Sequence, residues 1–360
     1  MRAALGLARR GLGNVWPNPA VGCILMRDGR VAGRGWTQPG GRPHAEAEAL
    51  GRAGQNARGA TAYITLEPCS HQGQTAPCVE ALLAAGIARA VIACQDPDPR
   101  VSGRGITRLG DGGVEVTTGP CAAEAEEVNA GFFLRVRANR PLITLKVATS
   151  LDGRIALHDG KSKWITGETA RAWAHRLRAC HDAVMVGIGT ALADDPKLTC
   201  RLPGLAHRSP VRVVVDSRLR LPLSSQVVAG AREPPTWLIT RSDGDERRRR
   251  AYAKRGVEVI AIDADDHLPM LKVVQELGRR GVTRLLVEGG SQIAAALLRQ
   301  GLVDRLAWFR APRLIGGDGV AAAAAFGVDR LEDMARFERI SVVRAGEDIL
   351  ETYRRKPTDA

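Results

Sequence analysis

The stretch ATAYITLEPCSHQGQTAPC, residues 60 to 78, decides the architecture of the first half of this chain. The run ATAYITLEP predicts a strand, because it is rich in apolar and β-branched residues and ends in a proline. Cys69 follows at a turn or helix start, and Cys78 opens a predicted helix that ends near Ala85. Two cysteines nine positions apart can form a disulfide, bind a metal ion or stay as small buried side chains.

The bulk composition narrows the class of protein. The chain has 360 residues, enough for two or three domains, and its hydrophobic share of 44% is ordinary for a globular protein. No window of about eighteen residues is apolar and free of charge, so we expect no membrane span. Seven cysteines are too few for a disulfide framework, which predicts a reducing, cytoplasmic compartment. Arg9 and Arg10 interrupt any signal-peptide core, and whether a turn precedes Met1 stays open.

The formal net charge of +13 raises the question of nucleic-acid binding. Most basic residues are arginines scattered through every segment, and only ERRRRAYAKR, residues 246–255, forms a cluster. We interpret this cluster as a solvated helix face and expect phosphorylated small ligands, with no nucleic acid and no membrane as partners. A basic nucleic-acid deaminase or binding protein remains the alternative.

Strand and helix signals alternate along the chain, which predicts an α/β architecture. The Asp-Gly pair in MRDGR, residues 26–30, indicates a hairpin, and residues 121–140 read as one helix. A new apolar strand begins after Pro141. We therefore predict two domains, residues 1–140 and residues 141–360.

A histidine and a glutamate lie upstream of the two cysteines. PHAEAEAL, residues 43–50, places His44 and Glu46 at the start of a predicted helix. One imidazole and two thiolates, from His44, Cys69 and Cys78, would leave the fourth position of tetrahedral zinc open, as in catalytic sites. Such a site needs a carboxylate that takes and returns a proton, and Glu46 is placed for this role. Eight residues between the cysteines depart from the two of the general zinc-deaminase pattern.

The second half contains a strand, two glycines and a helix in succession. In RLLVEGGSQIAAALLRQG, residues 284–301, the predicted helix begins at Ser291, where backbone N–H groups can bind phosphate. An ordinary loop with a serine cap is the alternative. Lys146 lies in the apolar strand 142–149, which is costly unless it is paired, faces a cleft or lies on an edge strand.

Several stretches together resemble the bifunctional riboflavin-biosynthesis deaminase/reductase family. For the deaminase half they are residues 18–23 (NPAVGC), 43–50, 60–78 and 95–106 (QDPDPRVSGRGI). For the reductase half they are residues 142–156 (LITLKVATSLDGRIA), 162–166 (SKWIT), 191–201 (ALADDPKLTCR) and 311–319 (APRLIGGDG). The resemblance covers nearly the whole chain in family order, and the longer cysteine spacing is normal in this family. It implies a cytidine-deaminase-like three-layer α/β/α domain followed by a dihydrofolate-reductase-like α/β domain.

The resemblance also implies site residues. It places zinc on His44, Cys69 and Cys78, with Glu46 as the catalytic proton carrier and with Asn18 and His71 near the substrate. NADPH is expected at Ala148, Trp164, Thr190, Asp194, Ser217, Gly290, Ser291, Gln292, Ile293, Ala294, Ala295 and Ala296. In the reductase half, substrate contacts are expected from Lys146, Ser162, Arg178, Leu198, Arg201 and Glu288, of which the two arginines suit a phosphate.

The implied activity is zinc-dependent deamination of 2,5-diamino-6-(5-phosphoribosylamino)pyrimidin-4-one, followed by NADPH-dependent reduction of the ribosyl chain to ribityl. The partner is then a phosphorylated pyrimidine, and a homo-oligomer is left open. The family usually carries Arg or Lys where this sequence has Gln74. Alternatives are therefore a reductase-only enzyme with an impaired deaminase site and a non-catalytic zinc-stabilised scaffold.

Overall fold

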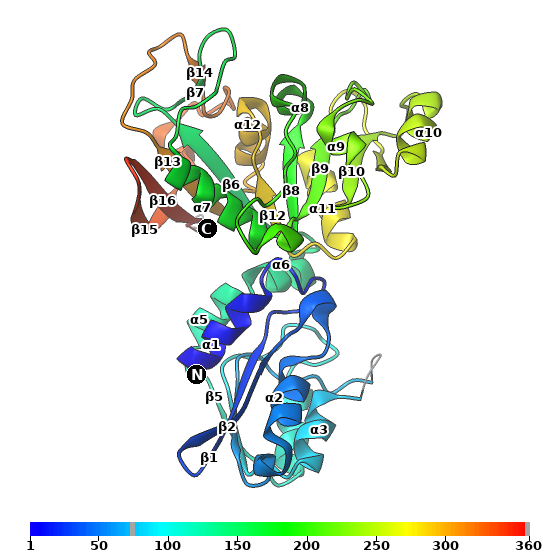
Figure 1. Cartoon of the computed structure of the whole chain (residues 1–360), viewed down its shortest axis with the longest axis vertical. Helices are drawn as coiled ribbons and strands as arrows, with labels where there is room; N and C mark the ends of the chain where they lie inside the picture. Colours follow the sequence, from blue (N-terminus) through cyan, green and yellow to red (C-terminus); the bar gives the residue numbers. More distant parts are fainter. Residues whose placement is uncertain (73–75, 357–360) are drawn as a thin grey trace. The chain divides into compact units, whose positions relative to one another are not determined.

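The computed structural model describes residues 1–72 and 76–356. The chain divides into two compact units, Met1–Asn139 and Arg140–Ala360 (Figure 1). Each unit has its own sheet and its own buried apolar cluster, so the predicted α/β architecture is confirmed for both. Among the helices of the described residues, none has both the length and the apolar character needed to cross a membrane.

The first unit contains a five-stranded sheet in the order β2-β1-β3-β4-β5. Its strands are β1 (Gly22–Arg27), β2 (Arg30–Trp36), β3 (Thr61–Ile64), β4 (Arg89–Ile92) and β5 (Glu115–Thr118). Its helices are α1 (Arg2–Ala8), α2 (Ala45–Ala53), α3 (Cys78–Ala84), α4 (Arg104–Asp111), α5 (Ala122–Val128) and α6 (Ala130–Ala138). In Figure 1 the sheet lies between α1 and α5 on one side and α2 and α3 on the other, which gives three layers.

Two features of this sheet position the segments that follow it. The predicted Asp-Gly hairpin is confirmed, because Asp28 and Gly29 adopt positive φ between the antiparallel strands β1 and β2. Strands β3, β4 and β5 run parallel. Their carboxyl ends therefore lie at one edge of the sheet, where α/β folds usually bind ligands.

The single helix predicted over residues 121–140 is wrong. The chain breaks into α5 and α6 at Asn129, which is 3% exposed. Asn129 Oδ1 accepts a hydrogen bond from Ala20 N at 2.9 Å, and its Nδ2 donates to Ala20 O at 3.2 Å. These two hydrogen bonds to the backbone of Ala20 hold Asn129 outside ideal helical geometry. Helix α4 was not predicted.

The second unit contains a nine-stranded sheet in the order β11-β10-β9-β8-β12-β6-β13-β16-β15, with a separate β14-β7 pair. Its strands are β6 (Leu142–Thr149), β7 (Arg154–Ala156), β8 (Ala183–Gly187), β9 (Val211–Val215), β10 (Thr236–Arg241), β11 (Glu258–Ile262), β12 (Arg284–Val287), β13 (Arg305–Arg310), β14 (Val320–Ala321), β15 (Phe337–Ala345) and β16 (Asp348–Arg355). Its helices are α7 (Glu168–Ala179), α8 (Ile188–Asp194), α9 (Gln226–Ala229), α10 (Glu246–Lys254), α11 (Met270–Arg279) and α12 (Ser291–Arg299).

Both faces of the large sheet bury apolar side chains. Helix α7 packs against the face of β13 and β16 that carries Phe309 and Leu350. On the other face, Leu306 and Trp308 line an apolar pocket of about 310 Å³ below α12. Strand β6 lies between β12 and β13, so Lys146 is not on an edge strand.

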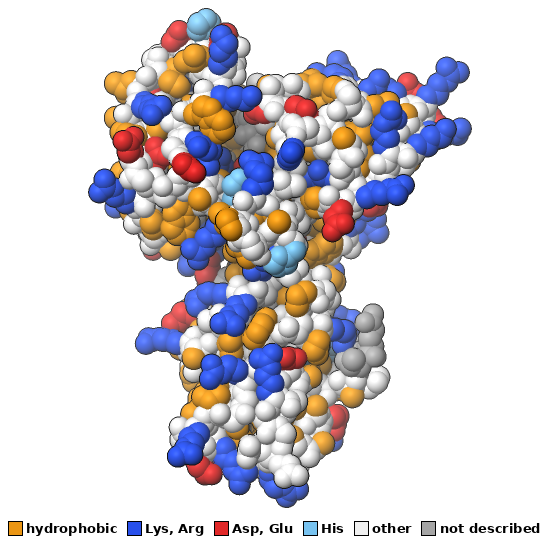
Figure 2. All heavy atoms as spheres, in the orientation of Figure 1, with side chains coloured by type: hydrophobic (Ala, Val, Ile, Leu, Met, Phe, Trp, Pro, Cys, Tyr) orange, Lys and Arg blue, Asp and Glu red, His pale blue; other side chains and the backbone are white. Residues whose placement is uncertain are grey.

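The basic surplus is distributed over the surface. On the face shown in Figure 2, lysine and arginine side chains are scattered over each unit. In α10, Glu246 forms ion pairs with Arg249 and Arg250, at 3.8 and 3.0 Å. Arg248 donates to Leu221 O at 3.3 Å. These partners agree with the interpretation of residues 246–255 as a solvated helix face.

A buried histidine links α7 to the sheet. His181 Nδ1 contacts Leu177 O at 2.7 Å and Nε2 contacts Thr144 Oγ1 at 2.9 Å. The carbonyl needs a donor, so Nδ1 carries the proton and Nε2 accepts from the threonine hydroxyl. Burial lowers the pKa of His181 to about 4, which keeps the ring neutral at neutral pH.

We predict that acidification destabilises the second unit through His181. Between about pH 6.5 and pH 4 the unfolded chain protonates this ring, whereas the folded protein does not, so stability is lost as the pH falls. The His181 contribution to the free energy of unfolding should decrease by up to about 3 kcal/mol across this window. Urea unfolding at pH 7 and pH 4.5, followed by tryptophan fluorescence, measures it. His181→Gln should lose this contribution, whereas the control His158→Gln, at an exposed ring, should retain it; equal pH dependence in all three proteins would contradict the assignment.

Candidate active sites

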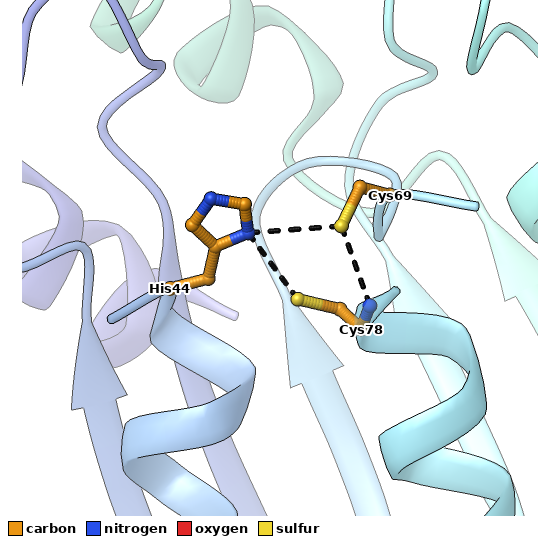
Figure 3. A group of neighbouring side chains, drawn as sticks. All are labelled: His44, Cys69 and Cys78. Carbon is orange, nitrogen blue, oxygen red and sulfur yellow. Dashed lines mark hydrogen bonds between the residues drawn. The ribbon is translucent and has the colours of Figure 1, made fainter. Parts of the chain in front are cut away.

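The first candidate site lies where β3, α2 and α3 meet. His44 is the N-cap of α2, Cys78 is the first residue of α3, and Cys69 lies in the segment after β3 (Figure 3). His44 Nδ1 is 3.3 Å from Cys78 Sγ and 3.7 Å from Cys69 Sγ. The three donor atoms all lie within 4.8 Å of one another. The structure thus brings the three predicted ligands together.

The start of α3 stabilises negative charge on the Cys69 sulfur. Cys78 N donates to Cys69 Sγ at 3.3 Å, and Val79 N donates to Cys69 O at 3.2 Å. Cys69 was expected at a helix or turn start; no helix starts there, since α3 begins nine residues later and its first N–H group faces the Cys69 sulfur. A backbone N–H at a helix N-terminus stabilises a thiolate in this position.

The protonation states of the Cys69 and Cys78 thiols depend on each other. Hydrogen bonds from Cys78 and His44 lower the pKa of Cys69 to about 4, although burial opposes this shift. The pKa of Cys78 is raised, because it donates to Cys69 and is buried. All seven cysteines are free thiols, so the disulfide alternative does not hold in this structure. One imidazole and two convergent sulfurs form a donor set that fits tetrahedral zinc with an open position.

Glu46 lies in the first turn of α2 and is 3% exposed. Burial raises its pKa to about 7, and the negative charge of Cys69 adds to this shift. It is not part of the cluster formed by the three donor atoms. A carboxylate that titrates near neutral pH suits proton transfer rather than permanent metal ligation.

Three further predicted residues belong to this half. Asn18 packs its amide against Gly41 in the turn before His44, where an added Cβ would lie 1.8 Å from Asn18 Nδ2. His71 Nδ1 is buried and has no hydrogen-bond partner among the described residues. Gln74 lies outside the described residues.

Two buried carboxylates near Cys69 were missed by the sequence reasoning. Glu67 is 3% exposed and Asp96 is 6% exposed. Burial raises the pKa of Asp96 to about 6, with the nearby charges of Asp98, Glu67 and Cys69 adding to the shift. The available signal was their position, because each follows the carboxyl end of a parallel strand.

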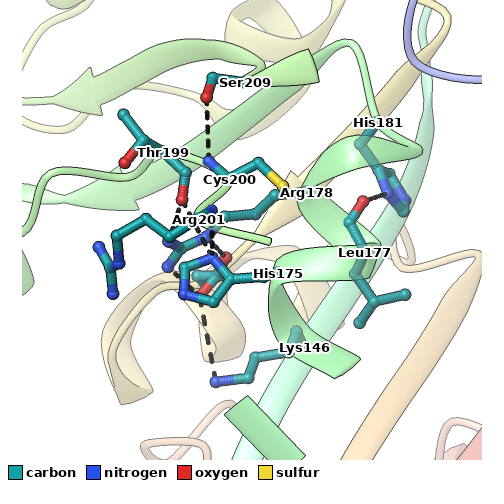
Figure 4. A network of polar contacts seen from close by, with 10 residues as sticks. Lys146, His175, Leu177, Arg178, His181, Thr199, Cys200, Arg201 and Ser209 are labelled. Carbon is teal, nitrogen blue, oxygen red and sulfur yellow. Dashed lines mark hydrogen bonds and ion pairs between the residues drawn. The ribbon is translucent and has the colours of Figure 1, made fainter. Parts of the chain in front are cut away.

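The second candidate site is a buried ion-pair network in the second unit (Figure 4). Arg178 binds Glu288 through two hydrogen bonds of 2.6 and 3.0 Å, and Lys146 Nζ lies 4.0 Å from the same carboxylate. Burial would raise the pKa of Glu288, but Arg178 and Lys146 hold it at about 2. Burial lowers the pKa of Lys146, and Glu288 opposes that shift. Three of the predicted substrate residues therefore converge.

A histidine that was not predicted joins this network. His175 Nδ1 lies 3.1 Å from Thr199 O, which also accepts a bond from Arg178 at 2.8 Å. Arg201 N lies 3.3 Å from the same histidine nitrogen. Burial, together with the charges of Arg178 and Arg201, lowers the pKa of His175 to about 4. Its place on α7, one turn before Arg178, was the available signal.

Except for Trp164, which comes after the antiparallel strand β7, the predicted cofactor residues lie at or after the carboxyl ends of parallel strands. Gly290 N donates to Thr190 Oγ1 at 3.0 Å, and Ser162 Oγ donates to Asp194 Oδ1 at 3.4 Å. Ala148 lies near the end of β6 and Ser217 just after β9. Trp164 is 64% exposed and stacks on Arg171.

Helix α12 begins at Ser291 without a side-chain cap, so its first N–H groups can face an anion. The backbone before it lies close to the helix, because a Cβ on Gly289 would lie 3.2 Å from Ile293 Cβ. The side chains of Ala294 and Ala295 are buried, which leaves only their backbone for a ligand, and Gln292 and Ala296 lie in the same helix. Leu198 is 2% exposed and belongs to the core cluster beside α8. These features fit a dinucleotide phosphate at the start of α12.

Comparison with known proteins covers nearly the whole chain. Residues 141–350 match the family model described as "RibD C-terminal domain", and residues 1–94 match "Cytidine and deoxycytidylate deaminase zinc-binding region". The riboflavin biosynthesis protein RibD of Aquifex aeolicus is 39% identical over 99% of this chain and 97% of its own length. The RibD protein of Escherichia coli is 40% identical over 97% of this chain and 96% of its own.

Two solved structures share both units. Acinetobacter baumannii RibD, form 1, superposes with a TM-score of 0.90 at 36% identity and covers 99% of this chain and 98% of that chain. The deaminase/reductase from Thermotoga maritima superposes with a TM-score of 0.86 at 33% identity, over 99% of this chain and 97% of that chain. That protein is named as a diaminohydroxyphosphoribosylaminopyrimidine deaminase and 5-amino-6-(5-phosphoribosylamino)uracil reductase.

We predict that Glu288→Gln strongly impairs the second site and spares the first. The neutral amide leaves Arg178 and Lys146 without a counter-charge in a largely buried site, which should cost the second unit about 3 kcal/mol. NADPH oxidation should fall at least about a hundredfold, because the side chains that meet at Glu288 lose their positions. Steady-state kinetics and urea unfolding measure both effects. The control Glu276→Gln, at a surface ion pair with Arg279, should keep wild-type activity, and an active Glu288→Gln enzyme would contradict the assignment.

Proposed function

The chain belongs to the RibD family of bifunctional deaminase/reductases of riboflavin biosynthesis, and we propose how its own residues divide the two reactions between its two units. Its folds are cytidine-deaminase-like and dihydrofolate-reductase-like, and its cofactors are zinc and NADPH. We assign the deaminase to residues 1–140 and the reductase to residues 141–360.

The proposed substrates are those in the name of the Thermotoga maritima relative. The first unit would take 2,5-diamino-6-(5-phosphoribosylamino)pyrimidin-4-one and release ammonia. The second unit would take 5-amino-6-(5-phosphoribosylamino)uracil and reduce its ribosyl chain to ribityl. Both are phosphorylated small molecules, in agreement with a basic surface that has no single nucleic-acid stripe on the face shown (Figure 2). The free thiols support a reducing, cytoplasmic compartment.

In the deaminase, His44, Cys69 and Cys78 would hold the zinc ion, whose role is to activate water for attack on the amino-bearing ring carbon. Glu46 would accept the proton of that water and deliver it to the leaving ammonia. Its burial beside the three donor atoms favours this role, because solvent cannot compete for the proton. Asn18 and His71 would hold the pyrimidine in the same pocket.

In the reductase, NADPH supplies the hydride, and the protein supplies orientation and charge. The first turn of α12, with Thr190 and Asp194, would bind the dinucleotide. Lys146 and Glu288 would bind the opened sugar chain and Arg178 and Arg201 the phosphate, with Ser162 and Leu198 contributing to the remainder of the substrate site. The buried ion pair keeps these groups charged and fixed before the substrate arrives.

The convergence of His44, Cys69 and Cys78 carries the deaminase proposal. Three donor atoms from separate segments lie within 4.8 Å, and a buried glutamate lies two residues from the histidine. A scaffold with purely structural zinc would use a fourth protein ligand rather than leave one position open.

We predict that Cys69→Ser removes zinc and abolishes ammonia release, while NADPH oxidation on the uracil intermediate continues. A serine hydroxyl is a poor zinc ligand, and the two sites share no residue. Metal analysis and two separate assays on the full chain test this, and chelation of the wild-type enzyme should give the same split. Cys121→Ser, at another thiol of the same unit, is the control. Loss of both activities together would refute independent sites.

We predict that Gln74→Arg strengthens substrate binding in the deaminase. A cation at this position would pair with the substrate phosphate, which should lower KM for ammonia release roughly tenfold with little change in kcat. Gln72→Arg adds the same charge two residues away and serves as the control. If only the Gln74→Arg variant released ammonia, the wild-type chain would be a reductase alone.

A further inference from the structure

The side chain of Glu67 lies two residues before Cys69 and is 3% exposed. Its carboxylate accepts four backbone hydrogen bonds, all from residues between 96 and 106. Oε2 accepts at 3.2 and 3.0 Å and Oε1 at 2.8 and 3.3 Å, from the N–H groups of Asp96, Gly103, Gly105 and Ile106. A charged acceptor fixes such groups more strongly than a neutral one.

Three of these donors belong to the start of α4. Gly103 is the N-cap of this helix, and no side chain of its own segment caps it. The first N–H groups of a helix have no partner within the helix, so an outside acceptor must supply one. Glu67 therefore caps α4 from the segment that carries Cys69, and its negative charge suits a helix N-terminus.

The two segments also touch through their backbones. A Cβ on Gly105 would lie 2.3 Å from Pro68 O and 3.1 Å from Glu67 Oε1. Only glycine allows α4 to approach the Pro68–Cys69 segment this closely. The contact leaves little freedom for one segment to move without the other.

The fourth donor, the N–H group of Asp96, lies near the start of a turn that runs from residue 95 to residue 103. Within it, Asp98 N donates to Asp96 Oδ1 at 2.8 Å, and Asp98 pairs with Arg100 at 2.6 Å. Gln95 Nε2 donates to Ser102 Oγ at 2.9 Å. The turn is thus braced internally, and Glu67 joins Asp96 and Gly103, near its two ends, to the segment that carries Cys69.

This turn lies at the same edge of the sheet as the proposed deaminase site. It follows β4, which is parallel to β3, and Glu67 N itself donates to Cys94 O at 3.0 Å. Asp96 is 6% exposed, which places its carboxylate inside the fold near Cys69. The turn therefore lies beside the segment that carries Cys69, at the strand ends where α/β folds usually bind ligands.

We propose that Glu67 is a positioning residue of the deaminase, which sets the distance between the 95–103 turn and the zinc-binding segment and thereby shapes the pocket that receives the pyrimidine. The inference rests on the proposed deaminase function. Glu67 is not one of the three clustered donor residues, and its carboxylate binds the turn and the start of α4, so we expect its effect to pass through them.

Glu67→Gln tests the proposal with little change in volume. The amide group replaces one acceptor oxygen by a donor, which then faces backbone N–H groups and cannot bind them. The matched control is Glu80→Gln, because Glu80 also holds α4, through an exposed ion pair with Arg108 at 2.8 Å. Both variants are made in the full chain, and NADPH oxidation by the second unit reports that each protein is intact.

A pocket wall that has moved should weaken substrate binding. KM for ammonia release should rise about tenfold in Glu67→Gln, with kcat within about twofold of wild type and zinc content unchanged. Glu80→Gln should match wild type in all three quantities. Unchanged kinetics, loss of zinc, or a fall in kcat at constant KM would each overturn the proposal.

Hydrogen–deuterium exchange gives a second measurement. The amides of residues 96, 103, 105 and 106 should exchange faster in Glu67→Gln than in wild type, and those of β3 should not. Glu67→Asp, which keeps the charge but shortens the side chain, should give a smaller change of the same kind. If the wild-type chain released no ammonia, the proposed function would fail, and exchange would still decide whether Glu67 positions the turn; equal exchange in both proteins would overturn it.

Discussion

The deaminase half depends on bringing one imidazole nitrogen and two sulfur atoms to a single point from three separate segments. His44 lies 25 positions before Cys69 and 34 before Cys78, so no local structure brings them together. The parallel pair β3 and β4 ends at one edge of the sheet, and α2 and α3 start there. Because helix starts present free N–H groups, this edge also favours thiolates and a carboxylate. The roles proposed for Glu46 and Glu67 depend on the same arrangement.

The reductase half also brings side chains from separate segments together, and the described part of this unit contains no cluster of metal-ligating residues. Glu288 directly follows the carboxyl end of β12, where its carboxylate pairs with Arg178 from α7 and Lys146 from β6. Burying these charges is costly, and the cost is met only because the two cations share one well-bonded carboxylate. In both units the proposed site thus lies at the carboxyl ends of parallel strands, and neighbouring helices supply the remaining groups.

Local patterns predicted a large part of this arrangement, and long-range contacts account for the rest. The strands, the Asp-Gly hairpin and the convergence of His44 with the two cysteines follow from spacing and residue type. The break at Asn129 does not, because its partner Ala20 lies 109 residues away. The setting of Lys146 was left open for the same reason, since only the strand order shows that β6 is central. Glu67 and His175 carried no motif of their own, because the backbone groups that bind Glu67 lie 29 to 39 residues away and Thr199, which contacts His175, lies 24 residues away.

The excess of positive charge on the surface is accompanied by acidic side chains in the interior of the protein. Among the described residues, a single arginine is buried, Arg212. Seven aspartates and glutamates are buried: Glu46, Glu67, Asp96, Asp182, Asp216, Asp348 and Glu351. Several of these carboxylates bind backbone N–H groups rather than arginine side chains. Asp182 accepts from Thr283 and Arg284, and Asp348 accepts from Gly167. A backbone donor has no side-chain rotamers to lose, so it stabilises a buried carboxylate at a lower entropic cost than a flexible arginine. The carboxylates that join distant segments are therefore withdrawn from the surface, which makes the surface more basic than the net charge of the chain suggests and agrees with the two phosphorylated substrates that we propose.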